Sequence, residues 1–326
     1  MSRQRGAALI VALLIVATVV TLVVSLASDF LVPLKRTENL IHEQQALSYL
    51  LTTEGVARQV LLADMASSTL DGASELWATE QLQFPTPQGL IVATLRDLQG
   101  LINLNQLNYN PATNSPRPYS AQQERFIRLL QVLPLDQPLT FDEAQPLANA
   151  VFDWLDADDT ERIPGGAESY QYSALEPPVR MPQGGQIKDV SELRWVSGMT
   201  DEIYTALKPY VSVWPDRNGG LNVNTAPFEI LRCLNATGVY LPLTEVEVEQ
   251  ILEERTTAGA FEDMGIFNTG ALQGMQIDTT GLTTASNYFE LDASTEFLGR
   301  IFYLTSTFNR NAQANSIRLV ARNQSR

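Results

Sequence analysis

The sequence predicts an α+β protein in which a long N-terminal transmembrane helix packs on a small antiparallel sheet that carries a large all-helical insertion. Three patterns lead to this prediction. An uncharged apolar run covers 7–27, and apolar residues then recur at helical spacing to about residue 66. Strand-like segments at 89–97 and after 285 enclose a helical middle, as expected for one sheet domain with a helical insertion.

The N-terminal run is long enough to cross a membrane. About 20 apolar residues with a rise of ~1.5 Å each span a hydrocarbon core of ~30 Å, and 7–27 contains only mild polar interruptions. A cleaved secretory signal and a plain signal anchor are the alternatives. The helical pattern argues against cleavage after the span because it continues to about Met65, with a kink expected at Pro33. Since Arg3 and Arg5 precede the span, we expect a cytoplasmic amino terminus and a head outside.

The residues before the span resemble the leader of type IV pilins and pseudopilins. A basic hexapeptide ends at Gly6, and an apolar helix that continues into a head begins at Ala7. The resemblance implies that a prepilin peptidase cleaves between Gly6 and Ala7 and that the new amino terminus at Ala7 is methylated. It divides the start of the chain into a leader, 1–6, and the transmembrane part of the helix, 7–27. It also implies a single-pass inner-membrane protein whose head lies in the periplasm.

One position departs from the usual pilin pattern. Most pilin-like proteins carry glutamate at the fifth mature position, where it pairs with a neighbour's amino terminus, but the fifth residue counted from Ala7 is Val11. A subunit without this acid suits a position with no subunit above it, and it is similar in this respect to the K minor pseudopilins of type II secretion systems. The resemblance implies a non-enzymatic subunit at the tip of the pseudopilus, which starts assembly and supports export across the outer membrane. The implied partners are the pseudopilus and the minor pseudopilins I and J, with H as a further candidate.

Composition argues against the commoner enzymes and against nucleic-acid binding. The 326 residues carry a formal net charge of −15, whereas phosphate contacts need clustered Lys and Arg, so we expect no nucleic-acid partner. His42 is the single histidine and lies on the stem, so the head has no His-based triad or zinc site. Cys233 is the single cysteine. It cannot form an internal disulfide, and we expect it to be a buried, small apolar residue.

Turn residues and periodicity divide the rest of the chain into three parts. The stem and first strands cover 28–107 with a loop over 67–85, the helical insertion covers 108–284, and the C-terminal strands cover 285–326. In the insertion we expect a long loop over 156–185 and helices at 121–133, 141–155, about 189–196 and 200–207. The expected strands of the sheet are 89–97, 288–291, 301–307 and 316–321.

The middle of the chain contains an internal repeat. Residues 101–105, Leu-Ile-Asn-Leu-Asn, match residues 220–224, Gly-Leu-Asn-Val-Asn, and each segment precedes two apolar helices. The two units resemble helix-hairpin-helix modules, many of which bind DNA through backbone amides and basic residues. The second hairpin region, 235–249, carries three acids and no Lys or Arg. We therefore expect packing and interaction scaffolds, and a membrane-anchored helix-hairpin-helix nucleic-acid binder is the alternative function.

A dense acidic segment after the helix at 141–155 is the candidate cofactor site. Four aspartates lie within 153–159, and such charges repel one another unless a cation lies among them. The oxygens of Asp156, Asp158 and Thr160 occupy the first, third and fifth places of an EF-hand-like loop. Glu168 falls one place late for that motif, and the glycines are not at the sixth place. A solvated acidic loop and a catalytic carboxylate pair are the alternatives.

A family resemblance favours calcium at this segment. The K pseudopilins have calcium sites in their helical domain, and Asp-Trp-Leu-Asp-Ala-Asp over 153–158 with Gly-Ala-Glu over 166–168 looks like their signature. We therefore expect a calcium site with Asp156, Asp158 and Glu168 as side-chain ligands. Asp159 and Thr160 are further candidates, and a backbone carbonyl is the alternative to them.

Overall fold

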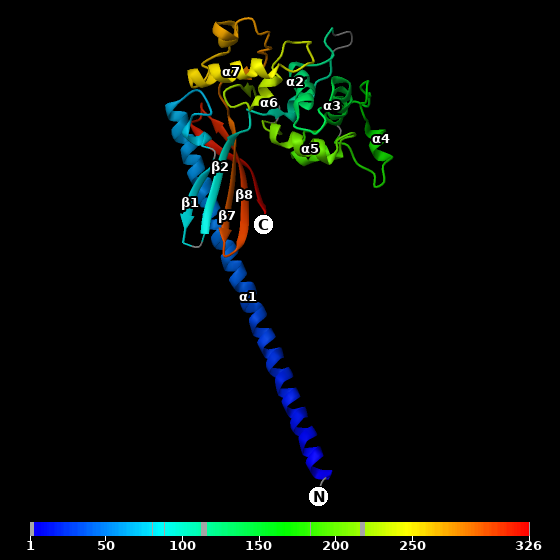
Figure 1. The fold of residues 1–326 in the computed structure, drawn as a ribbon, viewed down its shortest axis with the longest axis vertical. Coiled ribbons are helices and arrows are strands. Elements are labelled where there is room, and N and C mark those ends of the chain that lie inside the picture. Colours follow the sequence, from blue (N-terminus) through cyan, green and yellow to red (C-terminus); the bar gives the residue numbers. More distant parts are fainter. Residues whose placement is uncertain are drawn as a thin grey trace.

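The computed structural model describes residues 3–79, 81–87, 89–111, 116–182, 184–215 and 219–325. Its first element, α1 (Arg3–Ser67), is one continuous helix that passes through Pro33. The amino-terminal half of α1 extends away from the rest of the molecule (Figure 1), and its apolar side chains are exposed. Within the described residues, one helix is long and apolar enough to cross a membrane, with a mean hydropathy of 3.1. The predicted apolar anchor helix is therefore present.

The carboxy-terminal half of α1 packs on one antiparallel sheet with the strand order β1-β2-β7-β8-β9. Its strands are β1 (Leu82–Thr86), β2 (Gly89–Asp97), β7 (Tyr288–Phe297), β8 (Arg300–Asn311) and β9 (Ser316–Ser325). Ala46, Leu50 and Leu61 of α1 share one buried cluster with Phe289 and Leu304 of the sheet. This arrangement confirms the predicted long helix on an antiparallel sheet.

The prediction of a loop over 67–85 is wrong in two places. A short 3-10 helix forms at Leu76–Ala78, and β1 pairs with β2 so that Leu82 lies opposite Ala93. β1 is an edge strand, and Pro85 is tolerated in it because an edge strand leaves one row of backbone groups unpaired. Its proline and polar residues gave the segment the composition of a loop.

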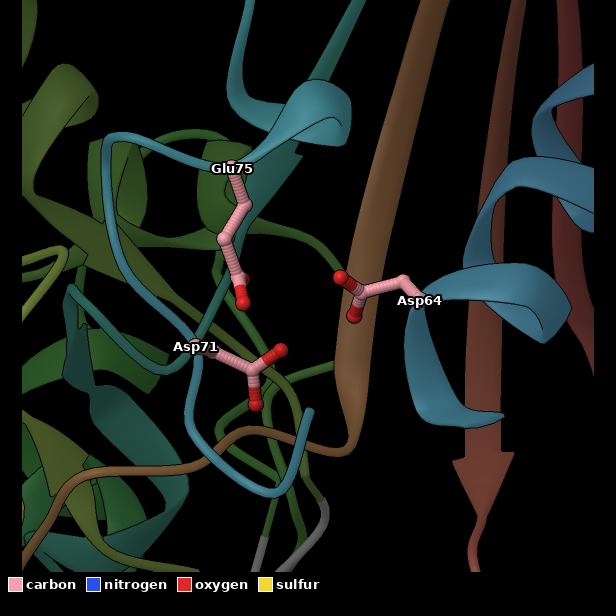
Figure 2. Close-up of side chains that lie close together, drawn as sticks. All are labelled: Asp64, Asp71 and Glu75. Carbon is pink, nitrogen blue, oxygen red and sulfur yellow. The ribbon is translucent and has the colours of Figure 1, made fainter. Parts of the chain in front are cut away.

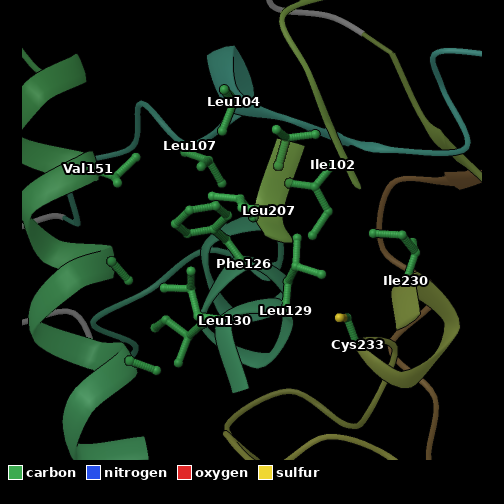
Figure 3. Packing of buried hydrophobic residues seen from close by; sticks show 14 of the residues in the cluster. Ile102, Leu104, Leu107, Phe126, Leu129, Leu130, Val151, Leu207, Ile230 and Cys233 are labelled. Atoms are coloured by element: carbon green, nitrogen blue, oxygen red, sulfur yellow. The ribbon is translucent and has the colours of Figure 1, made fainter. Parts of the chain in front are cut away.

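A helical region lies between β2 and β7, at the end of the molecule opposite the amino terminus (Figure 1). Its helices are α2 (Ala121–Val132), α3 (Phe141–Leu155), α4 (Ser169–Ser173), α5 (Asp201–Leu207), α6 (Phe228–Arg232) and α7 (Glu245–Ala258). Figure 3 shows its core, in which Phe126 and Leu129 of α2 lie near Val151 of α3 and Ile230 of α6. Cys233 is fully buried in the same core, as predicted.

The prediction that the insertion is all-helical is wrong. It contains short parallel strands: β5 (Leu221–Asn222) pairs with β6 (Leu282–Thr283) inside it, and β4 (Val211–Ser212) pairs with β3 (Ile102–Asn103), which precedes it. Strands of two residues are too short to show an alternating apolar pattern, so periodicity does not reveal them.

Two further elements differ from the prediction. The loop expected over 156–185 contains α4, which is shorter than two helical turns and so offers no periodic pattern to detect. The helix expected near 189–196 is a 3-10 helix, Val190–Trp195. The predicted bounds of β2 and of α3 are the observed ones.

The internal repeat is a repeat of one hydrogen-bonding scheme. Asn105 accepts the backbone N–H of Ile187 at 2.9 Å and donates to the carbonyl of the same residue at 3.0 Å. Asn224 accepts the backbone N–H of Phe261 at 2.8 Å and donates to its carbonyl at 3.0 Å. In both units the side chain of the first asparagine, Asn103 or Asn222, accepts a hydrogen bond from the backbone N–H of the second. Each Asn-x-Asn segment therefore anchors a distant chain segment.

Candidate metal centre

The acidic segment begins at the end of α3 and returns to the start of α4. Asp156 follows the last residue of α3, and Glu168 precedes the first residue of α4. Asp153, in the last turn of α3, folds the segment back because its Oδ2 accepts two backbone N–H groups. These belong to Arg162, at 3.1 Å, and Ala167, at 3.0 Å. As a result Glu168 lies beside the end of α3.

The two glycines of the segment allow this close approach. A Cβ on Gly166 would lie 2.1 Å from Oδ2 of Asp153 and 2.6 Å from the carbonyl oxygen of Arg162. Gly165 has a φ of +77°, in the left-handed region that favours glycine, and a Cβ there would lie 2.3 Å from that of Pro146. Since real Cβ atoms do not come this close to other atoms, the segment depends on the Gly-Gly pair.

Three of the predicted ligands come together. Asp156, Asp158 and Glu168 each place a carboxylate oxygen within 4.8 Å of the others. Two oxygens that bind one calcium ion at ~2.3–2.6 Å are at most about 5 Å apart, so the group has a spacing that fits a shared cation. Oδ1 of Asp156 and both oxygens of Glu168 are buried and have no hydrogen-bond partner in the described part of the chain. Such unsatisfied carboxylates are costly, and a cation between them would remove the cost.

Burial and mutual repulsion raise the pKa values of this group. Burial, followed by the charge of Asp158, raises the pKa of Asp156 to about 6. Burial also raises the pKa of Glu168 to about 7, and the neighbouring aspartates add to the shift. Both shifts show that the ionised carboxylates lack enough positive charge nearby, which is the environment that favours a bound cation.

Asp159 and Thr160 lie beside the three-carboxylate group with other contacts. Oδ1 of Asp159 accepts a hydrogen bond from Oγ of Ser169 at 2.8 Å, and Asp159 is not one of the three grouped carboxylates. The backbone N–H of Thr160 donates to Oδ1 of Asp158 at 2.9 Å and so helps to orient that carboxylate. The roles of all the named residues as metal ligands stay predictions.

Two neighbours of the site escaped the sequence reasoning. Nε of Arg162 lies 3.1 Å from Oδ1 of Asp153, and its Nη2 lies 3.5 Å from Oδ2 of Asp156. The amide of Asn110 donates to Oδ2 of Asp158 at 2.6 Å, across 48 positions of sequence. Arg162 could have been recognised as a neighbour of the site, because it is the one basic residue within the acidic segment 153–168. Nothing in the segment around Asn110 pointed to the site.

The predicted processing residues lie at the start of α1. Gly6 and Ala7 belong to its first turns, and Ala7 and Val11 are exposed on the part that is apolar enough for a membrane. Cleavage after Gly6, methylation of Ala7 and the role of Val11 stay predictions.

An apolar anchor helix that packs on an antiparallel sheet, with a helical region beyond it, defines a membrane-anchored structural subunit of the pilin-like class. Two family models described as type II secretion system (T2SS), protein K match residues 100–216 and 221–286. The chain belongs to the type II secretion system protein K family, whose members are non-enzymatic pseudopilins. It is therefore a component of the type II secretion system.

Several type II secretion system K proteins are similar to this chain. The protein of Pectobacterium carotovorum is 36% identical over 69% of this chain and 67% of its own length. That of Pseudomonas aeruginosa is 30% identical over 98% of this chain and 92% of its own length. Among solved structures, a chain of the GspK-GspI-GspJ complex from enterotoxigenic Escherichia coli has a TM-score of 0.71 and 24% identity, over 89% of this chain and 99% of that one. That solved chain and the chain described here share the same fold.

Proposed function

We propose that this chain is the minor pseudopilin at the tip of the periplasmic pseudopilus, where it helps to start assembly and supports protein export across the outer membrane. Val11 carries the proposal, because it leaves the fifth mature position without the carboxylate that would pair with the amine of a following subunit. The place of the helical region, at the end of the molecule opposite the amino terminus, supports it (Figure 1). A subunit stacked above would meet this bulk.

The start of the chain supports a specific maturation. A prepilin peptidase cleaves between Gly6 and Ala7, and the new amino group of Ala7 is methylated. Arg3 and Arg5 precede the apolar part of α1 and are the positive residues expected on the cytoplasmic side. The protein then spans the inner membrane once, with its head in the periplasm.

The proposed partners are the minor pseudopilins I and J, with H as a further candidate. The solved GspK of similar fold is in a complex with GspI and GspJ, and the exposed apolar half of α1 offers a surface on which other stems can pack.

The acidic group at the end of α3 is proposed to bind calcium. Asp156, Asp158 and Glu168 would supply carboxylate oxygens, and Asp159, Thr160 or a backbone carbonyl would complete the shell. The orphaned, buried oxygens of Asp156 and Glu168 support this assignment. The ion would neutralise the cluster and keep the segment between α3 and α4 folded, a structural role with no reaction at the metal.

The experiment that tests the proposal expresses the full chain with the I and J pseudopilins and purifies the assembly in detergent. We expect one copy of each protein, and Val11→Glu should allow a further subunit to follow this chain, which crosslinking between pilin stems would detect. Val11→Leu, which keeps the position apolar, is the matched control. Failure to associate with either partner, or many copies of the unaltered chain per filament, would contradict the proposal.

A further inference from the structure

A second acidic cluster lies where the stem meets the head. Asp64 belongs to the last turns of α1, and Asp71 and Glu75 follow it in the loop before the sheet. Each places a carboxylate oxygen within 4.8 Å of the others. Figure 2 shows the three side chains converging from α1 and from this loop. The cluster shares no residue with the group at the end of α3.

Asp71 has an oxygen that the protein does not satisfy. The residue is fully buried, and its Oδ1 has no hydrogen-bond partner in the described part of the chain. Its Oδ2 accepts the backbone N–H of Ser286 at 2.7 Å and a bond from Arg310. The buried Asp97 nearby gives a comparison, because both of its oxygens accept hydrogen bonds. The unpartnered oxygen of Asp71 therefore points to a ligand from outside the chain.

One arginine does not balance the charge of this cluster. Arg310 of β8 pairs with Asp64 at 2.9 Å and also with Asp71. Three carboxylates beside one guanidinium leave an excess of two negative charges when all are ionised. This excess is the charge that a divalent cation would neutralise.

Two members of the cluster, Asp64 and Glu75, face an open groove from which an ion and its water ligands can reach it. A groove of about 670 Å³ runs along α1, and Asp64, Ser67 and Glu75 are among its lining residues. Oε2 of Glu75 accepts hydrogen bonds from the N–H groups of Gly72 and the Trp77 ring. These bonds hold the side chain in place and leave Oε1 for an ion. Calcium takes six to eight oxygen ligands, some of them water, so a site with an open side suits it.

We propose that Asp64, Asp71 and Glu75 bind a divalent cation of the calcium type and that this ion fastens the stem to the head. The backbone of Asp71 already joins the loop to the helical region: its carbonyl accepts from the Asn222 amide at 3.1 Å, and its N–H donates to Thr284 at 2.9 Å. The site therefore connects α1, the sheet and the helical region. This proposal does not depend on the tip position proposed above.

The test isolates this site in the full chain in detergent. The parent carries Asp156→Asn and Glu168→Gln, so that the cluster at the end of α3 is disabled, and calcium chloride is titrated by calorimetry. We expect one remaining calcium site and a calcium-dependent rise in melting temperature. Adding Glu75→Gln, or separately Asp64→Asn, should weaken that binding by about tenfold or more, because each removes one carboxylate ligand.

Glu54→Gln is the matched control, because Glu54 lies on the same helix and pairs with Arg322 at 2.6 Å outside the cluster. It removes the same charge and an ion pair, and calcium affinity should stay within about twofold of the parent value. Circular dichroism without calcium verifies that each variant is folded. A parent that binds no calcium, or equal affinities in the parent, Glu75→Gln and Asp64→Asn, would overturn the proposal. So would a loss in Glu54→Gln as large as that in Glu75→Gln.

Discussion

Asp153 and Arg162 are joined twice: Oδ2 of Asp153 accepts the backbone N–H of Arg162 at 3.1 Å, and Nε of Arg162 lies 3.1 Å from Oδ1. Arg162 also lies within ion-pair distance of Asp156. It therefore holds the returning part of the acidic segment against the end of α3. The protein thus neutralises only part of the charge of this segment. The remaining charge determines how the segment should respond to cations, to pH and to substitution.

Removal of divalent cations should destabilise the full chain. An ion that binds only the folded state stabilises it by about 2.7 kcal/mol at a free concentration one hundred times its Kd, so a chelator should lower the melting temperature. Asp156→Asn and Asp158→Asn should each reduce this response. Asp136→Asn, at an exposed position of the same region, should leave it unchanged. Differential scanning calorimetry with and without chelator measures the effect, and equal responses in all four proteins would refute it.

Without cations, the stability of the chain should fall as pH rises from about 4 to about 7. The pKa values of Asp156 and Glu168, ordinarily 3.8 and 4.5, are raised in the folded state to about 6 and about 7. At pH values between the ordinary and the raised pKa, the folded state binds more protons than the unfolded state. The free energy of unfolding therefore decreases as pH increases. Urea unfolding in chelator at several pH values measures the slope. The double variant Asp156→Asn, Glu168→Gln should have a shallower slope, and an identical slope would contradict the assignment.

Gly166→Ala should distort the backbone of the acidic segment. Its Cβ would overlap Oδ2 of Asp153, and we expect a loss of about 1–3 kcal/mol in the free energy of unfolding together with weaker calcium binding. Gly55→Ala is the control, since a Cβ at Gly55 would meet no atom within 4 Å and alanine in a helix interior is worth up to about 1 kcal/mol. Unfolding by urea, followed by circular dichroism, compares them. A neutral Gly166→Ala would show that the segment can relax.

The two asparagines of the repeat should be equally important for stability. Asn105→Ala and Asn224→Ala each leave a buried backbone N–H and a buried carbonyl without their hydrogen-bond partner. We expect each substitution to lower the free energy of unfolding by at least about 2 kcal/mol. Asn323→Ala, at an exposed position of β9, should stay within about 0.5 kcal/mol of the unaltered chain. Chemical unfolding provides the comparison. A large cost for one asparagine alone would mean that the two units are not equivalent.

Maturation should depend on Gly6. In cells that contain a prepilin peptidase, we expect the intact mass of the purified chain to begin at a methylated Ala7, and Gly6→Ala should retain the leader. Gln4→Ala changes the leader away from the cleavage site and should be processed normally. A functional chain that keeps Met1 would exclude this maturation.

The sequence predicted those parts of the fold that local patterns determine. β2 alternates exposed and buried residues, and α3 has a capping box between Thr140 and Glu143, so their bounds were predicted correctly. At the site, the aspartates follow one another in sequence, and the resemblance to the K pseudopilins allowed Asp156, Asp158 and Glu168 to be selected as a group. Contacts between distant segments were out of reach, since no local pattern links Asp64 to Arg310 across 246 positions.

β2 is paired with β7 along its whole length, and Asp97 at the end of β2 lies opposite Phe289 near the start of β7. The chain therefore leaves the sheet for the helical region and comes back at the same corner. A tight hairpin turn that joined these two strands directly would preserve the register of the sheet and its contacts with the stem. The pairing of the sheet therefore does not require the helical region, which enters and leaves the sheet domain at one corner.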